Sequence, residues 1–366
     1  MFLELIEVEN FRNLESNVRC GHGLNILVGL NGQGKTNWLE AINILATARS
    51  FKTSRLIESV KFGEEMAIIR GRVGRTEEIH RDLQAVVQGS SKSLFVNGKR
   101  EAIHSYLTQL HAVVFNADEL EVVRGHPDAR RRFLDQAIVS IHPPFVQTLA
   151  DYGRVIKQKN ALLQAARDER ISLEKAAEQL EPWNEQLITH AVRIHRARLR
   201  YVQRLNEALE TSLFGTEKVT MRYVSSLEGK GDLADYEGLL GERLKLRVQA
   251  ETAAGYSLIG PHRDDLEILL DGHDLRKYGS AGQQRSVLLL LQLANISVYY
   301  AQQQEYPLFL LDDIDAELDY QRIGHLLDFL EGKTQTFVTT SKESLVENFG
   351  SGADVFDVAS GRVRHR

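Results

Sequence analysis

Residues 29–36 contain the side chains of this chain that are best suited to phosphate chemistry. They read Gly29-Leu30-Asn31-Gly32-Gln33-Gly34-Lys35-Thr36 and match the pattern G-x-x-x-x-G-K-[ST] at every required position. The glycines let backbone N–H groups turn toward phosphate oxygens, because a Cβ atom would block the backbone angles and the close approach. We expect Lys35 to neutralise the β- and γ-phosphates and Thr36 to offer its hydroxyl to Mg²⁺. The segment predicts a P-loop that binds a nucleoside triphosphate; the alternative is a glycine-rich turn with a chance lysine.

Two adjacent carboxylates form the second reactive group. The apolar run Leu308–Leu311 reads as a buried strand and is followed directly by Asp312 and Asp313. A carboxylate at the end of a strand beside the P-loop strand can hold Mg²⁺, directly or through water, and we assign this role to Asp312. Asp313 is expected to polarise a water molecule in line with the γ-phosphate. Lys35, Asp312 and Asp313 are therefore the predicted catalytic residues; the alternative is a capped turn without a catalytic role.

Three further places offer groups to the same phosphates. Arg12 follows the first predicted strand and could reach a bound phosphate, although a surface arginine at a strand end is the alternative. Ser280 and Gly282 precede a long apolar helix, where a serine hydroxyl and exposed N–H groups form either an anion site or an ordinary N-cap. Thr339 or Thr340, at the end of a late apolar strand, is expected to sense the γ-phosphate, and Thr340 is taken as the site residue.

Regular elements are expected on both sides of these groups. Residues 24–28 read as a buried strand before the loop, and apolar residues between Trp38 and Leu45 recur at helical spacing. Further strands are expected at 2–8, in three short runs between 66 and 96, and at 111–115, 218–224 and 336–341. Residues 287–301 are expected to form a core helix. This mixture predicts an α/β fold built on a mixed sheet.

Residues 128–213 have a different character, with dense charge and apolar residues at helical spacing. Two helices, each with one apolar face, are expected to form an antiparallel hairpin whose arms are about 30 to 45 residues long. The predicted domains are an ATPase lobe with the P-loop at 1–127, a helical lobe at 128–213, and the remainder of the ATPase lobe at 214–366.

The second helix of this hairpin has an uneven distribution of charge. Residues 187–205 include no acid, and four arginines fall within one narrow stripe at about 100° per residue: Arg193, Arg196, Arg200 and Arg204. Such a stripe suits the phosphate backbone of DNA, and counterion release would make the affinity salt-dependent. The alternative is a solvated face that pairs with the acids of a neighbouring helix, such as Glu169, Glu174 and Glu178.

Composition limits the other possibilities. The chain has 366 residues, 43% of them hydrophobic, which suggests two lobes. Its 45 basic and 50 acidic side chains give a formal charge of −5, so contact with nucleic acid must rely on a local patch. The single cysteine, Cys20, excludes internal disulfides and a cysteine-cluster zinc site. With an acidic start and no apolar run long enough to cross a bilayer, a cytoplasmic protein without membrane contact is expected.

Several motifs together resemble a known family. The order of P-loop, short helical insertion, Ser280-Ala281-Gly282-Gln283-Gln284, Leu310-Leu311-Asp312-Asp313 and Asp315-Ala316-Glu317-Leu318-Asp319 resembles an ABC-type ATPase head of the SMC-like class. More narrowly, the chain is similar to the RecF family of bacterial recombination mediators. That similarity rests on Glu9-Asn10-Phe11-Arg12-Asn13-Leu14, Arg130-Arg131-Arg132-Phe133-Leu134-Asp135 and Gly260-Pro261-His262-Arg263-Asp264-Asp265-Leu266.

The resemblance implies an ATP-binding head with a short helical lobe, which forms a homodimer on ATP. The signature residues Ser280, Gly282 and Gln283 would meet the γ-phosphate held by the other subunit. It also implies a weak, DNA-stimulated ATPase with ATP and Mg²⁺ as cofactors, whose hydrolysis dissociates the dimer. The implied partners are double-stranded DNA near single-strand gaps, RecR and RecO, with RecA loaded downstream in DNA repair, replication restart and the SOS response. Asp313 departs from the glutamate common at this position in ABC ATPases, which fits slow hydrolysis.

Three other classes compete with this interpretation. An SMC or zinc-hook repair ATPase needs long coiled-coil arms, and a hook needs paired cysteines that one cysteine cannot supply. A transporter's nucleotide-binding subunit would place its signature much closer to the P-loop and would lack the arginine stripe. A DNA-binding scaffold with an inactive nucleotide site is the non-enzyme alternative, and intact Lys35, Thr36, Asp312 and Asp313 argue against it.

Overall fold

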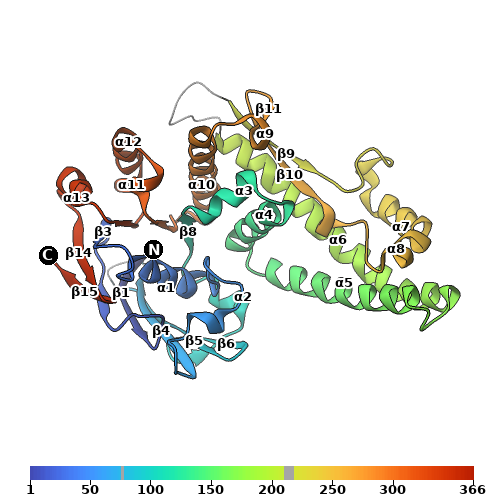
Figure 1. Cartoon of the computed structure of the whole chain (residues 1–366), viewed down its shortest axis with the longest axis horizontal. Coiled ribbons are helices and arrows are strands. Elements are labelled where there is room, and N and C mark those ends of the chain that lie inside the picture. Colours follow the sequence, from blue (N-terminus) through green and yellow to red (C-terminus); the bar gives the residue numbers. More distant parts are fainter. Residues whose placement is uncertain (76–77, 210–217) are drawn as a thin grey trace. The chain divides into compact units, whose positions relative to one another are not determined.

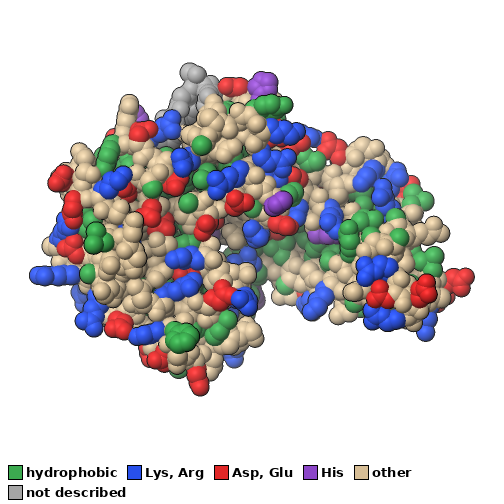
Figure 2. Space-filling model, viewed as in Figure 1, with side chains coloured by type: hydrophobic (Ala, Val, Ile, Leu, Met, Phe, Trp, Pro, Cys, Tyr) green, Lys and Arg blue, Asp and Glu red, His purple; other side chains and the backbone are tan. Residues whose placement is uncertain are grey.

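The computed structural model describes residues 1–75, 78–209 and 218–366. These residues fold into two compact units (Figure 1). Unit 1 contains residues 1–123 and 279–366, and unit 2 contains residues 124–207 and 218–278. No described helix is both long and apolar enough to span a bilayer. Figure 2 shows basic and acidic side chains interspersed over the visible surface, as expected for a formal charge of −5.

The first sheet of unit 1 has the order β15-β14-β3-β13-β12-β8 and is parallel except for β15 at its edge. Its strands are β3 (Leu24–Val28), β8 (Ala112–Phe115), β12 (Leu308–Leu311), β13 (Thr336–Thr340), β14 (Asp354–Ala359) and β15 (Arg362–His365). Every residue of β12 and β13 is buried, which explains why these strands read as continuous runs rather than alternating patterns. Because β3, β13 and β12 are parallel neighbours, their carboxyl ends meet at one edge.

The second sheet of unit 1 is antiparallel and has the order β2-β1-β4-β5-β6-β7. Its strands are β1 (Phe2–Glu9), β2 (Asn17–Arg19), β4 (Met66–Gly74), β5 (His80–Gln88), β6 (Ser91–Val96) and β7 (Lys99–Arg100). Asn97 and Gly98 join β6 to β7 with φ angles of 50° and 75°, values that asparagine and glycine tolerate best. The small antiparallel sheet predicted between residues 66 and 96 is therefore confirmed.

Helix α1 (Lys35–Thr47) lies between these two sheets, in contact with β8 and β13 of one and β4 and β5 of the other. The hydroxyl of Tyr106 donates to the carbonyl of Leu45 at 2.8 Å, which fixes the end of the helix. The other helices of unit 1 are η1 (Leu56–Ser59), α2 (Ile103–Tyr106), η2 (Asp118–Leu120), α10 (Ala281–Gln303), α11 (Ile314–Glu317), α12 (Tyr320–Leu330) and α13 (Glu343–Phe349). Helix α3 (Glu121–Arg124) ends where unit 2 begins.

Unit 2 combines helices with a three-stranded sheet of order β11-β10-β9. Its strands are β9 (Val219–Val224), β10 (Asp265–Leu270) and β11 (His273–Asp274). Its helices are α4 (Pro127–Ile141), α5 (Phe145–Arg167), α6 (Leu173–Leu209), η3 (Leu233–Asp235), α7 (Tyr236–Leu246), α8 (Val248–Ala254), η4 (Pro261–Arg263) and α9 (Leu275–Tyr278). The sheet covers α4, which packs on β10.

The division of the chain differs from the predicted domains mainly in where residues 218–278 belong. Residues 218–278 were expected in the ATPase lobe, whereas the structure places them in unit 2 with the helices. The reason is pairing over long sequence distances, because β9 pairs with β10, α4 packs on β10, and α5 packs on α8. The predicted boundary between residues 213 and 214 lies outside the described residues.

The helical hairpin is formed by α5 and α6, but its arms are unequal. Helix α5 has 23 residues and α6 has 37, so the first arm is shorter than expected. Pro143 and Pro144 explain the difference, because they separate α4 from α5 and confine the first arm to the residues after them. At 1.5 Å per residue the arms span about 35 Å and about 55 Å.

Two bidentate ion pairs join α4 to its neighbours in unit 2. The guanidinium of Arg198 on α6 donates to both carboxylate oxygens of Asp135 on α4, at 2.8 and 2.9 Å. Arg130, also on α4, donates to both carboxylate oxygens of Asp265 on β10, at 2.7 and 3.0 Å. Both arginines are buried. Planar guanidinium groups are well suited to buried, bidentate ion pairs with carboxylates.

Candidate active site

The predicted P-loop connects β3 to α1 and has the backbone that its glycines permit. Gly32 and Gly34 have φ angles of 79° and 106°, in the left-handed region that glycine adopts without strain. A Cβ atom on Gly29 would lie 2.3 Å from the carbonyl oxygen of Val358, which rules out any side chain there. Gly34 is the N-cap of α1 and provides no side-chain cap, so the first N–H groups of the helix remain available to an anion.

Lys35 lies over this loop rather than in solvent. Its side chain is folded inward with 5% of the residue exposed. The ammonium Nζ donates to the carbonyl oxygens of Gly29 at 2.8 Å and Leu30 at 3.1 Å. The loop therefore presents a fixed positive charge and a set of backbone N–H groups on the same turn. This combination binds the phosphates of a nucleotide.

Asp312 lies beside the P-loop, as the parallel order of the strands requires. The hydroxyl of Thr36 donates to Asp312 Oδ1 at 2.9 Å, and the hydroxyl of Thr339 donates to the same oxygen at 2.7 Å. Burial raises the pKa of the Asp312 carboxyl, and the neighbouring Asp313 acts in the same direction, while the hydrogen bonds from Thr339 and Thr36 oppose them. One carboxylate oxygen at the end of β12 is thus bonded both to the first turn of α1 and to β13.

Thr36 and Asp312 fit a magnesium ion. Their hydroxyl and carboxylate oxygens are the hard donors that Mg²⁺ prefers. Within the described residues there is no group of three or more His, Cys, Asp or Glu side chains that could form a complete metal cage. A site with so few protein ligands suits Mg²⁺, which keeps several of its waters and takes other ligands from substrate phosphates.

Asp313 has an unusual backbone. Its φ and ψ angles are 46° and 47°, a left-handed conformation that is rare for residues other than glycine and is tolerated best by Asn and Asp. Its N–H donates to the hydroxyl of Thr339 at 2.8 Å, so Thr339 fixes both acids at once. Burial raises the pKa of the half-buried Asp313 carboxyl, and the charge of Lys35 opposes this shift. Asp313 therefore lies within the electrostatic field of the P-loop lysine.

The signature segment begins α10 with a capping box. Gln283 N–H donates to the hydroxyl of Ser280 at 3.2 Å, and Ser280 N–H donates to Gln283 Oε1 at 2.9 Å. Within the part of the chain that the structure describes, the N–H groups of Ala281 and Gly282 have no hydrogen-bond partner. The anion site and the ordinary N-cap considered from the sequence therefore coexist. Ser280 caps its helix and is still exposed.

Ion pairs and one hydrogen bond connect α10, α11, α12 and the residues after β13. Arg285 on α10 donates to Glu317 on α11 at 2.7 Å. Arg322 on α12 donates to the hydroxyl of Ser286 at 2.7 Å. Lys342, after β13, pairs with Asp315 at 3.2 Å. The start of α10 is thus linked, within unit 1, to the short helix that begins after the two carboxylates.

Two predicted phosphate ligands point elsewhere. All three guanidinium nitrogens of Arg12 are used by the fold: Nε and Nη2 donate to the buried carboxylate of Glu40 at 2.9 and 2.8 Å, and Nη1 donates to the carbonyl of Glu58 at 2.8 Å. The buried hydroxyl of Thr340 accepts from the N–H of Lys342 at 3.0 Å, while Thr339 contacts Asp312. Roles of Arg12 and Thr340 at a phosphate remain predictions.

Some residues that contact and support the P-loop were not predicted from the sequence. The N–H of Ser360 donates to Gln33 Oε1 at 2.7 Å, and the N–H of Gly361 donates to the carbonyl of Gln33 at 2.8 Å. A Cβ on Gly34 would lie 3.0 Å from Oδ1 of Asn13, whose side chain therefore limits the loop. Their only signal in the sequence was Gly361, which lies between β14 and β15. A glycine is common at such hairpin turns, so it did not indicate a contact with the P-loop.

The four arginines of the predicted stripe lie on α6 in unit 2. Arg193, Arg196 and Arg200 are exposed and Arg204 is partly exposed. Among the described residues no carboxylate lies within 4 Å of any of the four. The proposed partners Glu169, Glu174 and Glu178 do not neutralise them, so the pairing alternative has no support in the structure. Arg198, one residue off the stripe, is the buried partner of Asp135.

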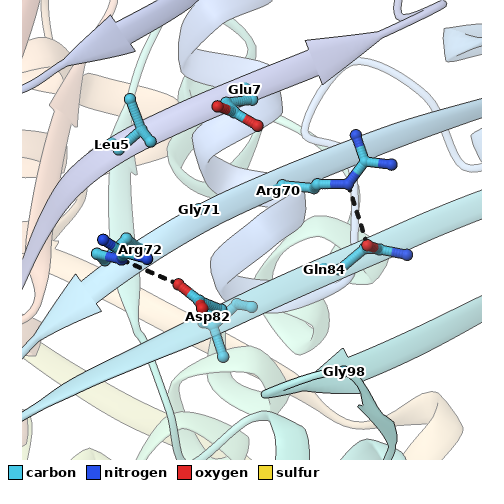
Figure 3. A pocket seen from close by; sticks show the side chains of 9 residues that line it. Leu5, Glu7, Arg70, Gly71, Arg72, Asp82, Gln84 and Gly98 are labelled. Atoms are coloured by element: carbon cyan, nitrogen blue, oxygen red, sulfur yellow. Dashed lines mark hydrogen bonds and ion pairs between the residues drawn. The ribbon is translucent and has the colours of Figure 1, made fainter.

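A hollow of about 260 Å³ on the antiparallel sheet is a different kind of site (Figure 3). Arg72 donates to Asp82 at 3.0 Å, and Arg70 donates to Gln84 at 3.1 Å. Arg70 also pairs with Glu9 at 3.3 Å. The charges of this hollow are largely paired within the sheet, so it lacks the excess positive charge that a nucleotide needs.

Comparison with known proteins identifies the class and then the family. A family model described as the RecF/RecN/SMC N terminal domain matches residues 2–364. A solved SMC head bound to the C-winged helix domain of ScpA superposes with a TM-score of 0.50 at 17% identity, over 100% of this chain and 98% of that one. This likeness concerns the fold alone. Together with the P-loop and its paired carboxylates, it defines an ABC-type ATPase head of the SMC kind.

The narrower match is to one family. The protein named DNA replication and repair protein RecF from Shouchella clausii is 34% identical over 378 residues, covering 100% of this chain and 99% of the relative. The protein of the same name from Ligilactobacillus salivarius is 34% identical over 377 residues, covering 99% and 97%. A solved structure of the recombination mediator protein RecF-ATPrS in the RecFOR pathway has a TM-score of 0.90 and 31% identity, covering 100% and 98%. The chain belongs to the RecF family.

Proposed function

We propose that this protein is an ATP-dependent recombination mediator that hydrolyses ATP, forms a homodimer on ATP and binds double-stranded DNA near single-strand gaps. It would act with RecR and RecO and help RecA to load in DNA repair, replication restart and the SOS response. The observation that carries the proposal is the set of hydrogen bonds from Thr36 and Thr339 to Asp312, which joins the P-loop to the carboxylate strand. The solved RecF-ATP relative, at 31% identity and a TM-score of 0.90, supports ATP as the nucleotide.

The residues of the site divide the work of hydrolysis. The P-loop N–H groups and Lys35 hold the phosphates and offset their charge. Thr36 and Asp312 would hold Mg²⁺, which supplies further neutralisation of phosphate charge when bound. Asp313, within the field of Lys35, orients a water molecule and accepts its proton. Thr339 is a positioning residue, because it fixes Asp312 through its hydroxyl and Asp313 through the backbone.

The exposed start of α10 supports dimerisation through the nucleotide. Gly282 has an ordinary φ angle, and a Cβ atom there would meet nothing within 4 Å, so the fold of the chain itself does not require glycine. A group that approaches closely from outside would require it. The unpaired N–H groups of Ala281 and Gly282 would meet the γ-phosphate held by a second copy of the chain. A symmetric dimer of this kind encloses two ATP molecules.

The arginine stripe supports contact with a phosphate backbone. Four exposed or partly exposed arginines without carboxylate partners form a local patch on a chain whose formal charge is −5. Arginine side chains on one helical face can each displace a counterion from duplex DNA. Because backbone contacts carry little sequence information, this binding would depend on DNA form rather than on sequence.

ATP turnover tests the enzymatic part of the proposal. The parental protein should release phosphate slowly in Mg²⁺-ATP and faster when duplex DNA is added. Lys35→Ala should lose stable ATP binding, because the charge that offsets the phosphates is gone. Unchanged ATP affinity in this variant would mean that the loop is not the site. A parental protein that binds DNA without any turnover would instead favour the inactive scaffold.

A further inference from the structure

The hairpin of unit 2 contains a hollow that the proposed function does not use. It lies between α5 and α6 and has a volume of about 570 Å³. Helix α5 contributes Arg154, Lys157 and Gln158 to its walls, and α6 contributes Trp183, Gln186 and His190. The volume falls within the range of small-molecule sites, which runs from roughly 300 to 1,000 Å³.

The α6 wall of this hollow continues the arginine stripe. At about 100° per residue, Trp183, Gln186, His190 and the stripe residues Arg193, Arg200 and Arg204 fall within an arc of about 100° on one face of α6. Arg196 lies about 40° outside that arc, on the side away from Trp183. A polyanion bound along the stripe would therefore reach the hollow without leaving this face of the helix.

The polar groups in the hollow are suited to an anionic aromatic ligand. Arg154 pairs with Asp151, which also lines the hollow, whereas Lys157 has no carboxylate within 4 Å among the described residues. Nδ1 of His190 is buried and has no hydrogen-bond partner in the described part of the chain. Gln158 and Gln186 are exposed and carry both a donor and an acceptor. The indole of Trp183 is only partly buried, so it offers a flat apolar surface beside these groups.

We infer that the hollow between α5 and α6 binds an unpaired nucleobase of single-stranded DNA, stacked on Trp183, with the adjoining phosphates on Lys157 and the arginine stripe. This inference rests on the proposed DNA binding by the stripe and adds a stacking site for one base beside it. An aromatic platform beside a positive groove is the usual arrangement for single strands, because every base has a face that can stack. Amide side chains can in turn pair with the edge of an exposed base.

Tryptophan fluorescence gives a direct measurement. The chain has two tryptophans, and Trp38 is buried in α1 with 1% exposed, so a ligand in the hollow should alter the emission of Trp183 alone. The probe is oligothymidylate of roughly a dozen nucleotides, added to the full-length protein. We expect quenching in the parental protein and none in Trp183→Phe, whose remaining emission comes from Trp38. A blunt duplex of the same length should quench much less.

Affinity measurements separate stacking from charge. Trp183→Ala should weaken oligothymidylate binding by about tenfold, as expected for one stacked base, while Trp183→Phe should keep most of the affinity. Lys157→Glu provides a second variant that leaves the indole in place and should also weaken binding. Leu199→Ala is the matched control, since Leu199 is an exposed residue of α6 with 44% exposed, away from this face. Binding of blunt duplex should be unchanged in all four.

The outcomes distinguish this inference from the proposed function. If Trp183→Ala and Lys157→Glu bind oligothymidylate like the parent, while duplex binding still depends on the stripe, the nucleobase site is wrong and the stripe stands. If polyglutamate quenches Trp183 and oligothymidylate does not, the hollow is a protein-docking site and the inference is likewise overturned. If stripe variants bind duplex normally, it is the proposed DNA contact that fails.

Discussion

At the scale of single residues, the chemistry of the site depends on how Asp312 and Asp313 are held. One oxygen of Asp312 accepts from Thr36 and Thr339, and the hydroxyl of Thr339 also accepts from Asp313 N–H. The left-handed backbone of Asp313 sets the direction of its carboxylate. Such backbone outliers persist where the surrounding contacts determine them, often at active sites. The two adjacent acids therefore have different surroundings, as the different roles proposed for them require.

Asp313→Asn separates these roles. The amide keeps the shape of the side chain and leaves the Thr36 and Thr339 contacts to Asp312 intact, but it cannot accept a proton from water. We expect ATP binding to be close to parental and turnover to fall by about 100-fold or more. Phosphate release and ATP binding should be measured on the same preparation. Asp319→Asn, at the N-cap of α12, is the control, because asparagine caps helices as well as aspartate. Parental turnover in Asp313→Asn would remove Asp313 from the mechanism.

The sequence predicted these reactive residues but not all of their neighbours. The P-loop pattern fixes Lys35 and Thr36 by local spacing, and a strand that ends in two acids reveals Asp312 and Asp313. Arg12 is different, because its role depends on Glu40. The sequence does not indicate that Glu40, in the apolar helix α1, is buried and forms an ion pair with Arg12. The choice between Thr339 and Thr340 depends on which face of the sheet each side chain points to, and a fully buried strand has no alternation of buried and exposed residues that would show this.

At the scale of elements, α6 has the exposed stripe on one side and the buried Arg198–Asp135 ion pair on the other. Arg198 faces Asp135 inside unit 2, whereas Arg196 and Arg200 face solvent. The 3.6-residue period of a helix produces this separation from a run of basic residues. Periodicity therefore predicted both helices and the exposed stripe. It did not predict that β9 and β10 join this unit, because strand pairing over about 40 residues leaves no local pattern.

Arg196→Glu/Arg200→Glu tests the stripe. Two proposed phosphate contacts become repulsive, so duplex affinity should fall by at least tenfold and the slope of log K against log salt should become shallower by about 2. ATP binding should be unchanged, because the P-loop lies in unit 1. Arg170→Glu/Lys175→Glu changes the net charge equally at two exposed positions outside the stripe and is the control. A variant of the stripe that keeps the parental slope would contradict the assignment.

His195, on the buried side of α6, makes unit 2 sensitive to acid. Its ring stacks on Tyr236 with a centroid distance of 3.8 Å, and burial, with Arg198 and Arg196 nearby, lowers its pKa to about 4. Between about pH 6.5 and 4 the unfolded chain binds the proton more readily than the folded one. The stability that neutral His195 contributes is therefore present near neutral pH and is lost as the pH falls through this window. Within the window, the free energy of unfolding should fall by about 1.4 kcal/mol per pH unit.

His195→Phe should flatten that dependence while it keeps the stacking on Tyr236. The measurement is the free energy of unfolding of the full chain by urea at several pH values from 7 to 4.5. The difference between parent and variant should change by about 2 kcal/mol or more across this range. Parallel curves would show that His195 does not titrate with the expected shift. His142→Phe, at the exposed C-cap of α4, is a control for the loss of a histidine.

At the scale of the whole molecule, the proposed nucleotide site requires a second copy of the chain. Lys35 and the carboxylates lie around the P-loop, whereas Ser280 and Gly282 are exposed at the start of α10. If each copy supplies one half of a nucleotide site, ATP stabilises the dimer and hydrolysis weakens it. The shared nucleotide site could be predicted from the sequence only through the family resemblance, because an interface between identical chains produces no periodic pattern of hydrophobic residues.

Ser280→Arg should prevent dimerisation while leaving ATP binding by the single chain intact. The new side chain puts bulk and charge where the second copy would approach. Size-exclusion chromatography with light scattering, with and without Mg²⁺-ATP, should show that the parental mass doubles with ATP and that the variant stays at the mass of one chain. Ser280→Ala removes the N-cap at a cost of about 1 kcal/mol but adds no bulk, so it should still dimerise. An ATP-bound Ser280→Arg dimer would contradict the assignment of this surface.

Mixing Ser280→Arg with Lys35→Ala tests the shared site most directly. In a mixed dimer, one composite site combines the intact Lys35 of one chain with the intact Ser280 of the other, and the second site carries both defects. Each variant alone should show almost no ATP turnover. The mixture should recover turnover to at most about half of the parental level, with a maximum near equal amounts of the two chains. No recovery at any ratio, with both variants folded, would show that Ser280 does not complete the site of a partner.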